Sequence, residues 1–258
     1  MKKILFLTLT FLLGAQHISA QDDTAEYGIF NHLGAAVSVG TDGIGIDVAT
    51  PLTNYVALRA GLSFWPKIKY SHNYRLNDSN PLITDNVDVE GKTNIFDGKL
   101  LADIYVSKHD GFHFTVGAFV GNSNIVKATN TSMFITDPSK YGKLGLKLGN
   151  YRVTTDENCY ANAEVKVNSF KPYLGIGFGR AIPQKNRVSV ACDLGVQFWG
   201  KPGLGAMTKD DWGDETYHKF QSSDLDEYDD PDLKDGLEIA EKFVVFPVIS
   251  IRISGRIF

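Results

Sequence analysis

The segment YLGIGFGRAI, residues 173–182, has three glycines spaced two apart, followed directly by Arg180. A glycine-rich loop that holds phosphate needs the pattern G-x-G-x-x-G between a strand and a helix. Here the spacing is G-x-G-x-G, and the residues after the arginine, Ala-Ile-Pro, do not begin a helix. The even positions over 170–178 are apolar and the odd ones are glycine or polar. The segment is therefore predicted to be a strand with a glycine-lined face and not a nucleotide site.

Clustered carboxylates in the segment 200–242 are a second candidate for chemistry. Asp224, Asp226 and Asp229 offer oxygen ligands of the kind that Ca²⁺ prefers. The run lacks the glycine and the spacing of an EF-hand loop, so we expect a solvated segment, with calcium binding as the alternative. Asp230 followed by a proline resembles a helix N-cap and first-turn pair, and predicts a short helix over 231–242. No Cys/His spacing typical of zinc occurs, and no metal or cofactor is expected.

Hydrolytic chemistry would need a serine, a histidine and an acid that meet in space. His72, His218, Ser63, Ser71 and Ser123 supply the residue types. No motif links them, so no catalytic residue is assigned and no enzyme is predicted, with a lipid-modifying enzyme as an alternative.

The first twenty residues resemble an export signal. Lys2 and Lys3 precede the mostly apolar run 4–13, and Ile-Ser-Ala before Gln21 forms a cleavage site. We expect a signal peptide at 1–20 and a mature chain at 21–258. Its two cysteines, Cys159 and Cys192, are expected to be free thiols, although an exported protein can oxidise such a pair.

Strict alternation of apolar and polar residues recurs along the rest of the chain. With 258 residues, a net charge of -4 and 25 glycines, the composition fits a β-rich protein and gives no basic signal for nucleic acid. No later run has the ~18 apolar residues of a membrane-spanning helix. Eight segments have period two and are predicted as strands: 33–39, 44–49, 56–64, 96–106, 112–121, 170–179, 188–198 and 245–254.

The connections at one end are all short, and three of the four at the other end are long, the exception being 41–43. Short turns are expected at 51–54, 107–111 and 183–187, and long loops at about 67–93, 127–168 and 200–242. This is the pattern of an outer-membrane barrel, with short periplasmic turns and long external loops. The fold class predicted is all-β, an eight-stranded antiparallel up-and-down transmembrane β-barrel. Within the loop 127–168, Tyr151 and Val167 bracket a possible projecting hairpin.

Aromatic residues favour lipid outside the predicted barrel, because such rings collect at headgroup level. They cluster near strand ends: Phe64, Trp65, Phe96, Phe170, Phe198, Trp199, Phe243 and Phe246 on the long-loop side, and Tyr55, Phe112, Phe178 and Phe258 on the other. The alternative is a soluble sandwich or lipocalin-like barrel whose charged face meets water.

An eight-stranded barrel has an interior only wide enough for side chains. The charged residues of the polar phase are therefore expected to fill it as a polar network: Asp47, Arg59, Asp97, Lys99, Asp103, Lys171, Asp193, Arg252 and Arg256. We expect a plugged lumen and not an open pore. His113 is expected to face the same interior.

The segments 55–61 (YVALRAG) and 171–179 (KPYLGIGFG), the signal-like start and the terminal strand 246–258 resemble small outer-membrane β-barrel proteins of Bacteroidota-type bacteria. The resemblance implies location in the cell outer membrane but no particular activity. One departure is Phe258, which is out of phase with Ile249, Ile251 and Ile253.

The expected role is structural or interaction-based, through the external loops. The expected partners are outer-membrane lipid and an extracellular protein or glycan, with no nucleic acid, and the chain is expected to be a monomer. A barrel that binds a small molecule or lipid is the alternative.

Overall fold

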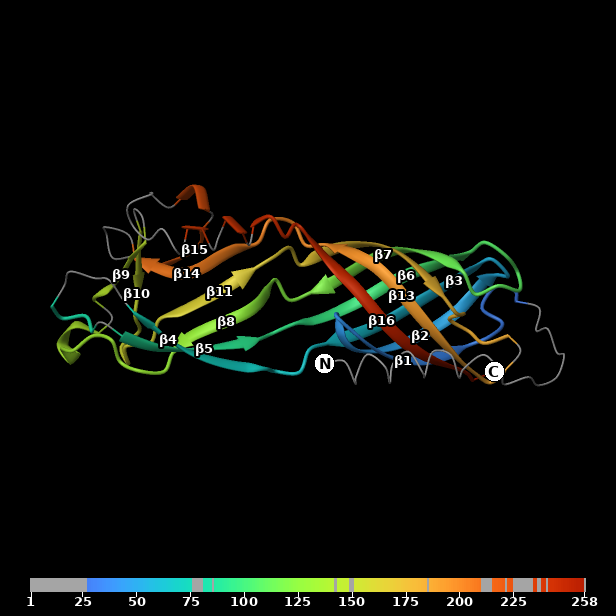
Figure 1. Ribbon diagram of the computed structural model, residues 1–258, viewed down its shortest axis with the longest axis horizontal. Helices are drawn as coiled ribbons and strands as arrows, with labels where there is room; N and C mark the ends of the chain where they lie inside the picture. The colour runs from blue at the N-terminus through green and yellow to red at the C-terminus, as the bar shows by residue number, and fades with distance from the viewer. Residues whose placement is uncertain are drawn as a thin grey trace, which may run out of the picture.

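The computed structural model describes residues 27–75, 81–84, 86–141, 143–148, 151–184, 186–209, 215–220, 222–224, 234–235, 238–239 and 241–257. The segment predicted as a signal peptide lies outside them. Two sheets follow one another along the long axis of the molecule, a closed barrel and a second, open sheet (Figure 1).

The barrel consists of eight antiparallel strands, and each pairs with the barrel strands that precede and follow it in the chain. The strands are β1 (Gly34–Gly40), β2 (Gly43–Thr53), β3 (Val56–Phe64), β6 (Phe96–Tyr105), β7 (His113–Gly121), β12 (Phe170–Phe178), β13 (Val188–Phe198) and β16 (Val245–Arg256). All eight predicted strands are confirmed. The first and last strands close the cylinder, from Gly34 opposite Arg256 to Gly40 opposite Ser250.

Side-chain exposure decides which phase of each strand faces outwards. Leu174 is 51% and Leu194 45% exposed, whereas Arg59 and Asp193 are each 4% exposed. The apolar phase is thus outside and the ionised phase inside, the reverse of a protein that folds around an apolar core in water. Closure also pairs the backbone groups of all eight strands, as hydrocarbon surroundings require. The soluble alternative is therefore wrong.

The segments predicted as long loops connect the expected strands, but much of their described length is strand. They contain β4 (Lys69–Arg75), β5 (Asn86–Thr93), β8 (Asn124–Asn130), β9 (Gly145–Leu148), β10 (Tyr151–Thr154), β11 (Asn162–Lys166), β14 (Gly203–Lys209) and β15 (Glu215–Phe220), with short 3₁₀ turns η1 (Pro138–Lys140) and η2 (Ser222–Asp224). These strands form the upper sheet, in the order β4-β5-β8-β11-β14-β10-β9 with β15 on β14. The hairpin expected over 151–167 is wrong, because β10 pairs with β9 and β14 while β11 pairs with β8 and β14.

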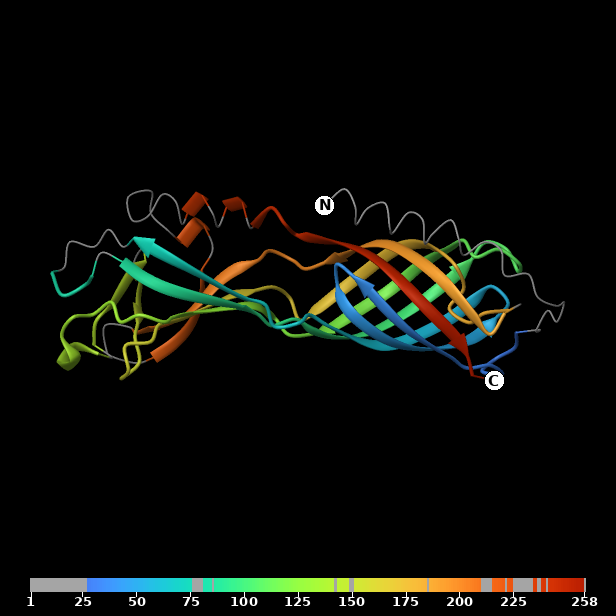
Figure 2. The same cartoon turned by 60° about the horizontal axis from the view of Figure 1, so that its bottom comes forward.

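The upper sheet continues the barrel. The strands β3, β6, β7, β12 and β13 run on into β4, β5, β8, β11 and β14 after short breaks, and keep their neighbours. Strands β1 and β2 are instead joined by Thr41 and Asp42 and end at the barrel rim. The upper sheet therefore remains open on the side above β1 and β2 (Figure 2). The barrel end that meets this sheet is called the mouth below, and the end with the short turns is called the base.

The inner and outer faces of the strands exchange polarity between the barrel and the upper sheet. Val126 and Val165 pack against the buried cluster of Ile125, Val167 and Trp199 inside the mouth. The opposite face of the upper sheet carries charged residues such as Lys127. Charges thus lie inside and apolar groups outside in the barrel, and the arrangement reverses above the mouth. The reversal marks the level at which the surroundings change from lipid to water.

The remaining predictions fall partly on the described residues. Lys234, Asp235, Glu238, Ile239 and Glu241 have helical backbone, and the rest of the helix predicted at 231–242, apart from Lys242, lies outside the described residues. Phe258 also lies outside them. In the part of the chain that the structure describes, no helix is long and apolar enough to cross a membrane. Cys159, buried in a loop beside the upper sheet, and Cys192, on barrel strand β13, are free thiols.

An arginine at the middle of the outer apolar face should cost much more than one at its edge. Leu174→Arg, at the centre of β12, is expected to lower the free energy of unfolding by roughly 2–4 kcal/mol, and Phe178→Arg, at the base, by about 0–1 kcal/mol. Denaturant titration of protein refolded into phosphatidylcholine vesicles measures both. Equal losses for the two variants would contradict a lipid-facing belt.

Candidate functional site

The centre of the barrel contains a buried layer of ion pairs. The Arg59 guanidinium forms two contacts with the Asp103 carboxylate, Nε to Oδ2 and Nη2 to Oδ1, each 2.8 Å. Its Nη1 lies 3.4 Å from Oδ2 of Asp193. Arg252 Nη1 lies 3.4 Å from the same Asp193 oxygen and 3.9 Å from Asp103 Oδ2. Two arginines thus share two carboxylates, and these four charges balance.

His113 and Thr115 complete the layer from the neighbouring strand β7. The Thr115 hydroxyl donates to Asp103 Oδ1 at 2.8 Å. His113 Nε2 lies 3.1 Å from Asp193 Oδ1 and its Nδ1 lies 2.8 Å from the Gly111 carbonyl oxygen. Both ring nitrogens therefore face acceptors. The sequence placed His113 inside, and Thr115 shares its phase, but no local signal showed that the hydroxyl binds a carboxylate.

Two further ion pairs lie between this layer and the mouth. Lys99 Nζ is 3.0 Å from Asp47 Oδ1, and Lys171 Nζ is 2.7 Å from Asp97 Oδ1. Eight of the nine charges predicted for the lumen are thus buried as four cations and four carboxylates. The ninth, Arg256, lies at the base, where it donates to the Gln184 carbonyl oxygen at 3.2 Å.

Glycines make the room that the central layer occupies. A Cβ atom on Gly177 would lie 2.5 Å from Asp193 Oδ1 and 2.6 Å from His113 Nε2. A Cβ atom on Gly175 would lie 2.6 Å from the Tyr173 hydroxyl oxygen. The inward space beside Gly175 and Gly177 is therefore needed for these side chains, whereas Gly179 has a positive φ of 108°.

An apolar cluster and an arginine close the base. The cluster contains Tyr27, Ala49, Ala57, Tyr105, Ala181 and Ile182. Burial raises the pKa of Tyr27 to about 12, although Arg256 and Arg180 oppose the shift. The hydroxyl is therefore protonated at neutral pH and donates to the carbonyl oxygens of Ile182 and Pro183, both at 2.9 Å.

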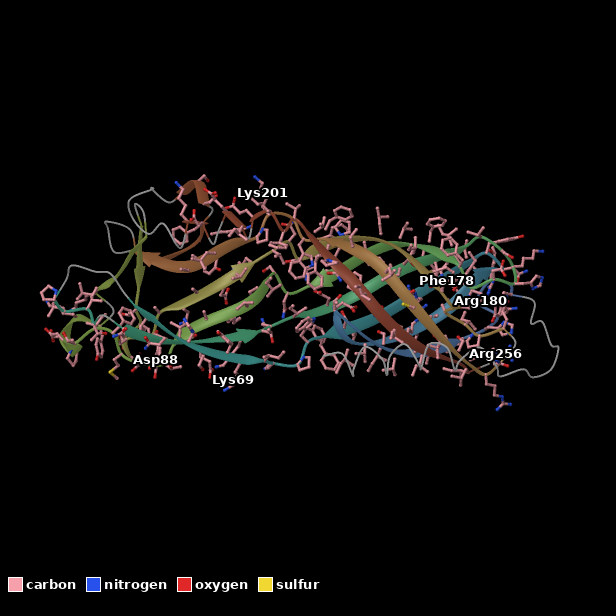
Figure 3. The ribbon with its side chains drawn as sticks, in the orientation of Figure 1. Lys69, Asp88, Phe178, Arg180, Lys201 and Arg256 are labelled. Atoms are coloured by element: carbon pink, nitrogen blue, oxygen red, sulfur yellow. The ribbon has the colours of Figure 1, made fainter. Side chains whose placement is uncertain are left out.

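Arg180, the arginine of the glycine-rich segment, holds the turns at the base together. Its guanidinium carbon lies 4.3 Å from the centre of the Tyr105 ring. Nη2 donates to the carbonyl oxygens of Ser107 and Lys108 at 2.8 and 2.6 Å. Arg180 and Arg256 both lie at the end of the barrel remote from the upper sheet (Figure 3). The sequence analysis placed Arg180 directly after the predicted strand 170–179 but gave no sign of these contacts.

A second apolar cluster lies across the mouth. Ile125, Val167 and Trp199 are buried there, and the Trp199 ring stacks on Phe246 with 4.3 Å between centroids. Trp199 Nε1 donates to Gln197 Oε1 at 2.8 Å. Trp199, directly after β13, and Phe246 of β16 lie at the long-loop end as predicted, but they point to the lumen side and not to lipid.

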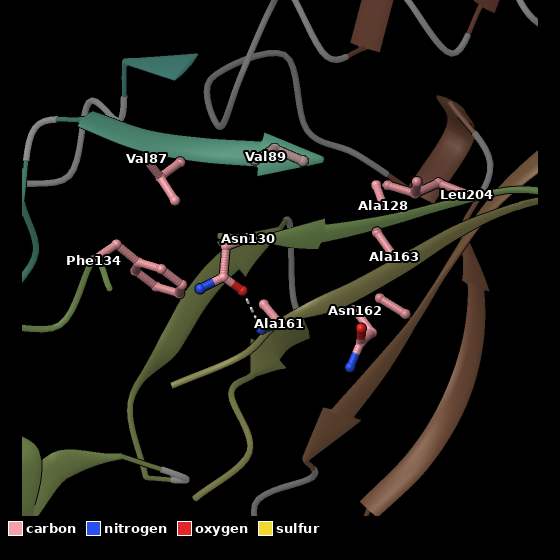
Figure 4. Close-up of a pocket in the computed structure, with 10 residues that line it drawn as sticks. Val87, Val89, Ala128, Asn130, Phe134, Ala161, Asn162, Ala163 and Leu204 are labelled. Atoms are coloured by element: carbon pink, nitrogen blue, oxygen red, sulfur yellow. Dashed lines mark hydrogen bonds between the residues drawn. The ribbon is translucent and has the colours of Figure 1, made fainter. Parts of the chain in front are cut away.

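The inner face of the upper sheet has a small apolar cavity of about 150 Å³. It is lined by small or branched side chains from four strands, including Val89, Ala128, Ala163 and Leu204, with Phe134 at one end (Figure 4). Asn130 also borders it, but its amide is engaged, since Nδ2 donates to the Cys159 carbonyl oxygen and Oδ1 accepts from Ala161 N.

The remaining candidates for chemistry are dispersed. Ser63 is buried inside the barrel, and His72 stacks on Tyr70 in β4. The His218 side chain lies outside the described residues, as do Asp226 and Asp229 of the acidic segment. Among the groups that the structure does describe, no cluster of His, Cys, Asp or Glu could hold a metal ion.

An antiparallel cylinder with an apolar exterior and an ion-paired interior defines a class, the eight-stranded transmembrane β-barrels. Two solved structures are similar to the chain, CarO2 and CarO of Acinetobacter baumannii. CarO2 is 16% identical, with 87% of this chain and 98% of that chain covered and a TM-score of 0.45. CarO is 17% identical, with 88% and 99% covered and a TM-score of 0.45. No family model and no curated protein sequence matches the chain. At this level of likeness, the fold assignment comes from the strand pairing and exposure of the chain itself.

Removing one carboxylate from the central layer should destabilise the barrel strongly. Asp103→Asn leaves Arg59 and Arg252 with one shared counter-charge, and breaking a buried ion pair in this way typically costs roughly 3–5 kcal/mol. Denaturant titration in vesicles measures the loss, and Arg252→Met added to Asp103→Asn should recover part of it. The control, Glu90→Gln at an exposed ion pair of the upper sheet, should stay close to wild type. Similar losses for Asp103→Asn and the control would contradict a neutral, coupled layer.

Proposed function

We propose that the protein is a monomeric outer-membrane β-barrel with a sealed polar lumen, and that its role is structural or interaction-based through the upper sheet. The observation that carries the proposal is the complete burial of side chains inside the barrel, both in the central layer and nearer the mouth. Asp103, His113, Lys171 and Arg252 are each 0% exposed. Side chains without contact to solvent leave no continuous water path at their level.

The charge arrangement supports a sealed lumen in a second way. The buried cations and carboxylates pair with each other, so an ion that passed through would have to separate them. The apolar clusters at base and mouth add a dry layer at each end. A porin interior is instead wide and water-filled.

The upper sheet supports an interaction role. It projects from the mouth (Figure 1) and ends on one side in β4, which pairs with β5. An edge strand has backbone groups free to pair with an extended segment of another chain. The proposed partners are an extracellular protein or a glycan, together with the lipid around the barrel. No reaction is proposed.

Location and closure can be tested together. We expect the protein in the outer-membrane fraction, and we expect the unboiled sample to migrate differently from the boiled one on a denaturing gel, because a closed barrel resists detergent. Recovery in the soluble fraction, with no change of mobility on boiling, would contradict the proposed placement.

A sealed lumen predicts that the protein does not conduct ions across a bilayer. Purified protein added to planar bilayers is expected to give no stable conductance steps, since the ion-paired layer fills the lumen. Boiled protein serves as the control for detergent artefacts. Reproducible unitary steps from folded protein that disappear after boiling would contradict a sealed lumen.

A second candidate function, binding of a small apolar group, is favoured by the cavity in the upper sheet. Its volume of about 150 Å³ is close to that of an engineered cavity that binds benzene or xenon. Xenon should shift the NMR signals of the Ala128 and Ala163 methyl groups, and Ala163→Phe should abolish the shift at Ala128. An unchanged xenon response in Ala163→Phe would remove this candidate.

A further inference from the structure

The outward face of the upper sheet carries a row of lysines in register. Lys69 on β4 lies directly opposite Lys92 on β5, which lies directly opposite Lys127 on β8. Their side chains are 64%, 47% and 49% exposed. Like charges directly opposite one another destabilise a sheet. The register therefore holds three cations together against their mutual repulsion.

Two glutamates on this face offset only part of the charge. Glu90 lies 2.7 Å from Lys92 Nζ and 3.7 Å from Lys69 Nζ. Glu164 lies directly opposite Lys127, and its carboxylate is 3.1 Å from Lys127 Nζ and 3.6 Å from Lys166 Nζ.

The row continues past Glu164 to β15. Gly205 lies between Glu164 on β11 and Lys219 on β15 in the register of the sheet. The lysine row is defined as Lys69, Lys92, Lys127, Lys166 and Lys219. With its two glutamates the row has a net charge of +3.

Glu164 is ionised and has several partners. Partial burial acts to raise the pKa of Glu164, but hydrogen bonds from Asn124 and Lys127 outweigh it and lower this pKa below its usual value. The Tyr217 hydroxyl also donates to Glu164 at 3.3 Å, and Lys166 Nζ lies 3.5 Å from the centre of the Tyr217 ring. The outward face of the upper sheet therefore keeps the excess positive charge of the lysine row.

The row lies just above the apolar belt, on the same outward side. Lys92 and Lys166 each come four positions before an exposed aromatic residue of the belt, Phe96 and Phe170. At ~3.3 Å per residue, four positions along a tilted strand are about 13 Å. A lysine side chain spans much of that height, so the ammonium groups reach the headgroup layer. Lys69 and Lys201 mark this level at opposite edges in Figure 3, and Asp88 lies farther from the barrel.

We propose that the lysine row binds the phosphate groups of an anionic lipid in the leaflet around the mouth. An ammonium group is a point-charge ligand for phosphate, and three adjacent strands present such groups at fixed spacing. Bound phosphate would relieve the repulsion that the register imposes. The inference rests on the proposed membrane placement, because only that placement brings headgroups to the row.

The test uses folded protein in neutral detergent and bisphosphorylated lipid A as the probe, with native mass spectrometry as the readout. The variant Lys69→Gln, Lys92→Gln, Lys127→Gln removes the centre of the row. A lysine near a charged lipid surface contributes roughly a fivefold factor to binding, so the variant should bind about 100-fold more weakly. The control, Lys108→Gln, Lys140→Gln, Lys143→Gln, removes three lysines elsewhere and should bind like wild type.

A control on the same samples checks that each variant forms a closed barrel. A folded variant should change its gel mobility on boiling, as wild type does. Equal binding by wild type and the triple variant would overturn the inference. So would equal binding of dephosphorylated lipid A, or full competition by millimolar inorganic phosphate, since the latter would indicate a site for free anions. A failure of the membrane placement itself would appear separately, as soluble fractionation of wild type.

Discussion

The structure depends on one constraint, that charge placed inside a narrow cylinder must be neutralised there. Water cannot solvate groups that are fully enclosed, so each cation needs a carboxylate within reach. The barrel meets this need with four of each sign, distributed over strands far apart in sequence. Several of these pairs join strands that are not hydrogen-bonded neighbours, such as β3 and β13 through Arg59 and Asp193 or β6 and β12 through Asp97 and Lys171. The same contacts that neutralise charge therefore fix the cross-section of the barrel.

The reversal of faces above the mouth follows from the same physics. A strand that leaves lipid for water must turn its charged side chains outwards and its apolar ones inwards. The short breaks between β5 and β6 and between β7 and β8 allow the side chains to change direction. The pairing of the strands is kept, because strands that are neighbours in the barrel continue as neighbours in the upper sheet. The bulge between Val165 and Lys166 is one local device for the change. One continuous set of strands is thus compatible with lipid around the barrel and with water around the upper sheet.

Period-two alternation was sufficient to predict the barrel strands, their order and their inward phase, since a strand with one face in lipid has a strong sequence signal. The upper sheet was missed because its strands are short and interrupted, and because length between barrel strands was taken to mean loop. Trp199 and Phe246 lie at the predicted end of the barrel but face inwards, because aromatic type indicates depth and not direction. The partners within the lumen, such as Thr115 with Asp103, depend on the curvature of the closed sheet, which no local pattern contains.

The two-residue turn at Thr41 and Asp42 has a consequence for the order of assembly. Thr41 Oγ1 donates to the Pro247 carbonyl oxygen and accepts from Ile249 N, so the turn is fastened to β16. The seam between first and last strands is therefore complete at the rim and lies beneath the gap in the upper sheet. Sealing of the cylinder needs nothing from the upper strands, so insertion can finish before the projecting half of the molecule has organised itself.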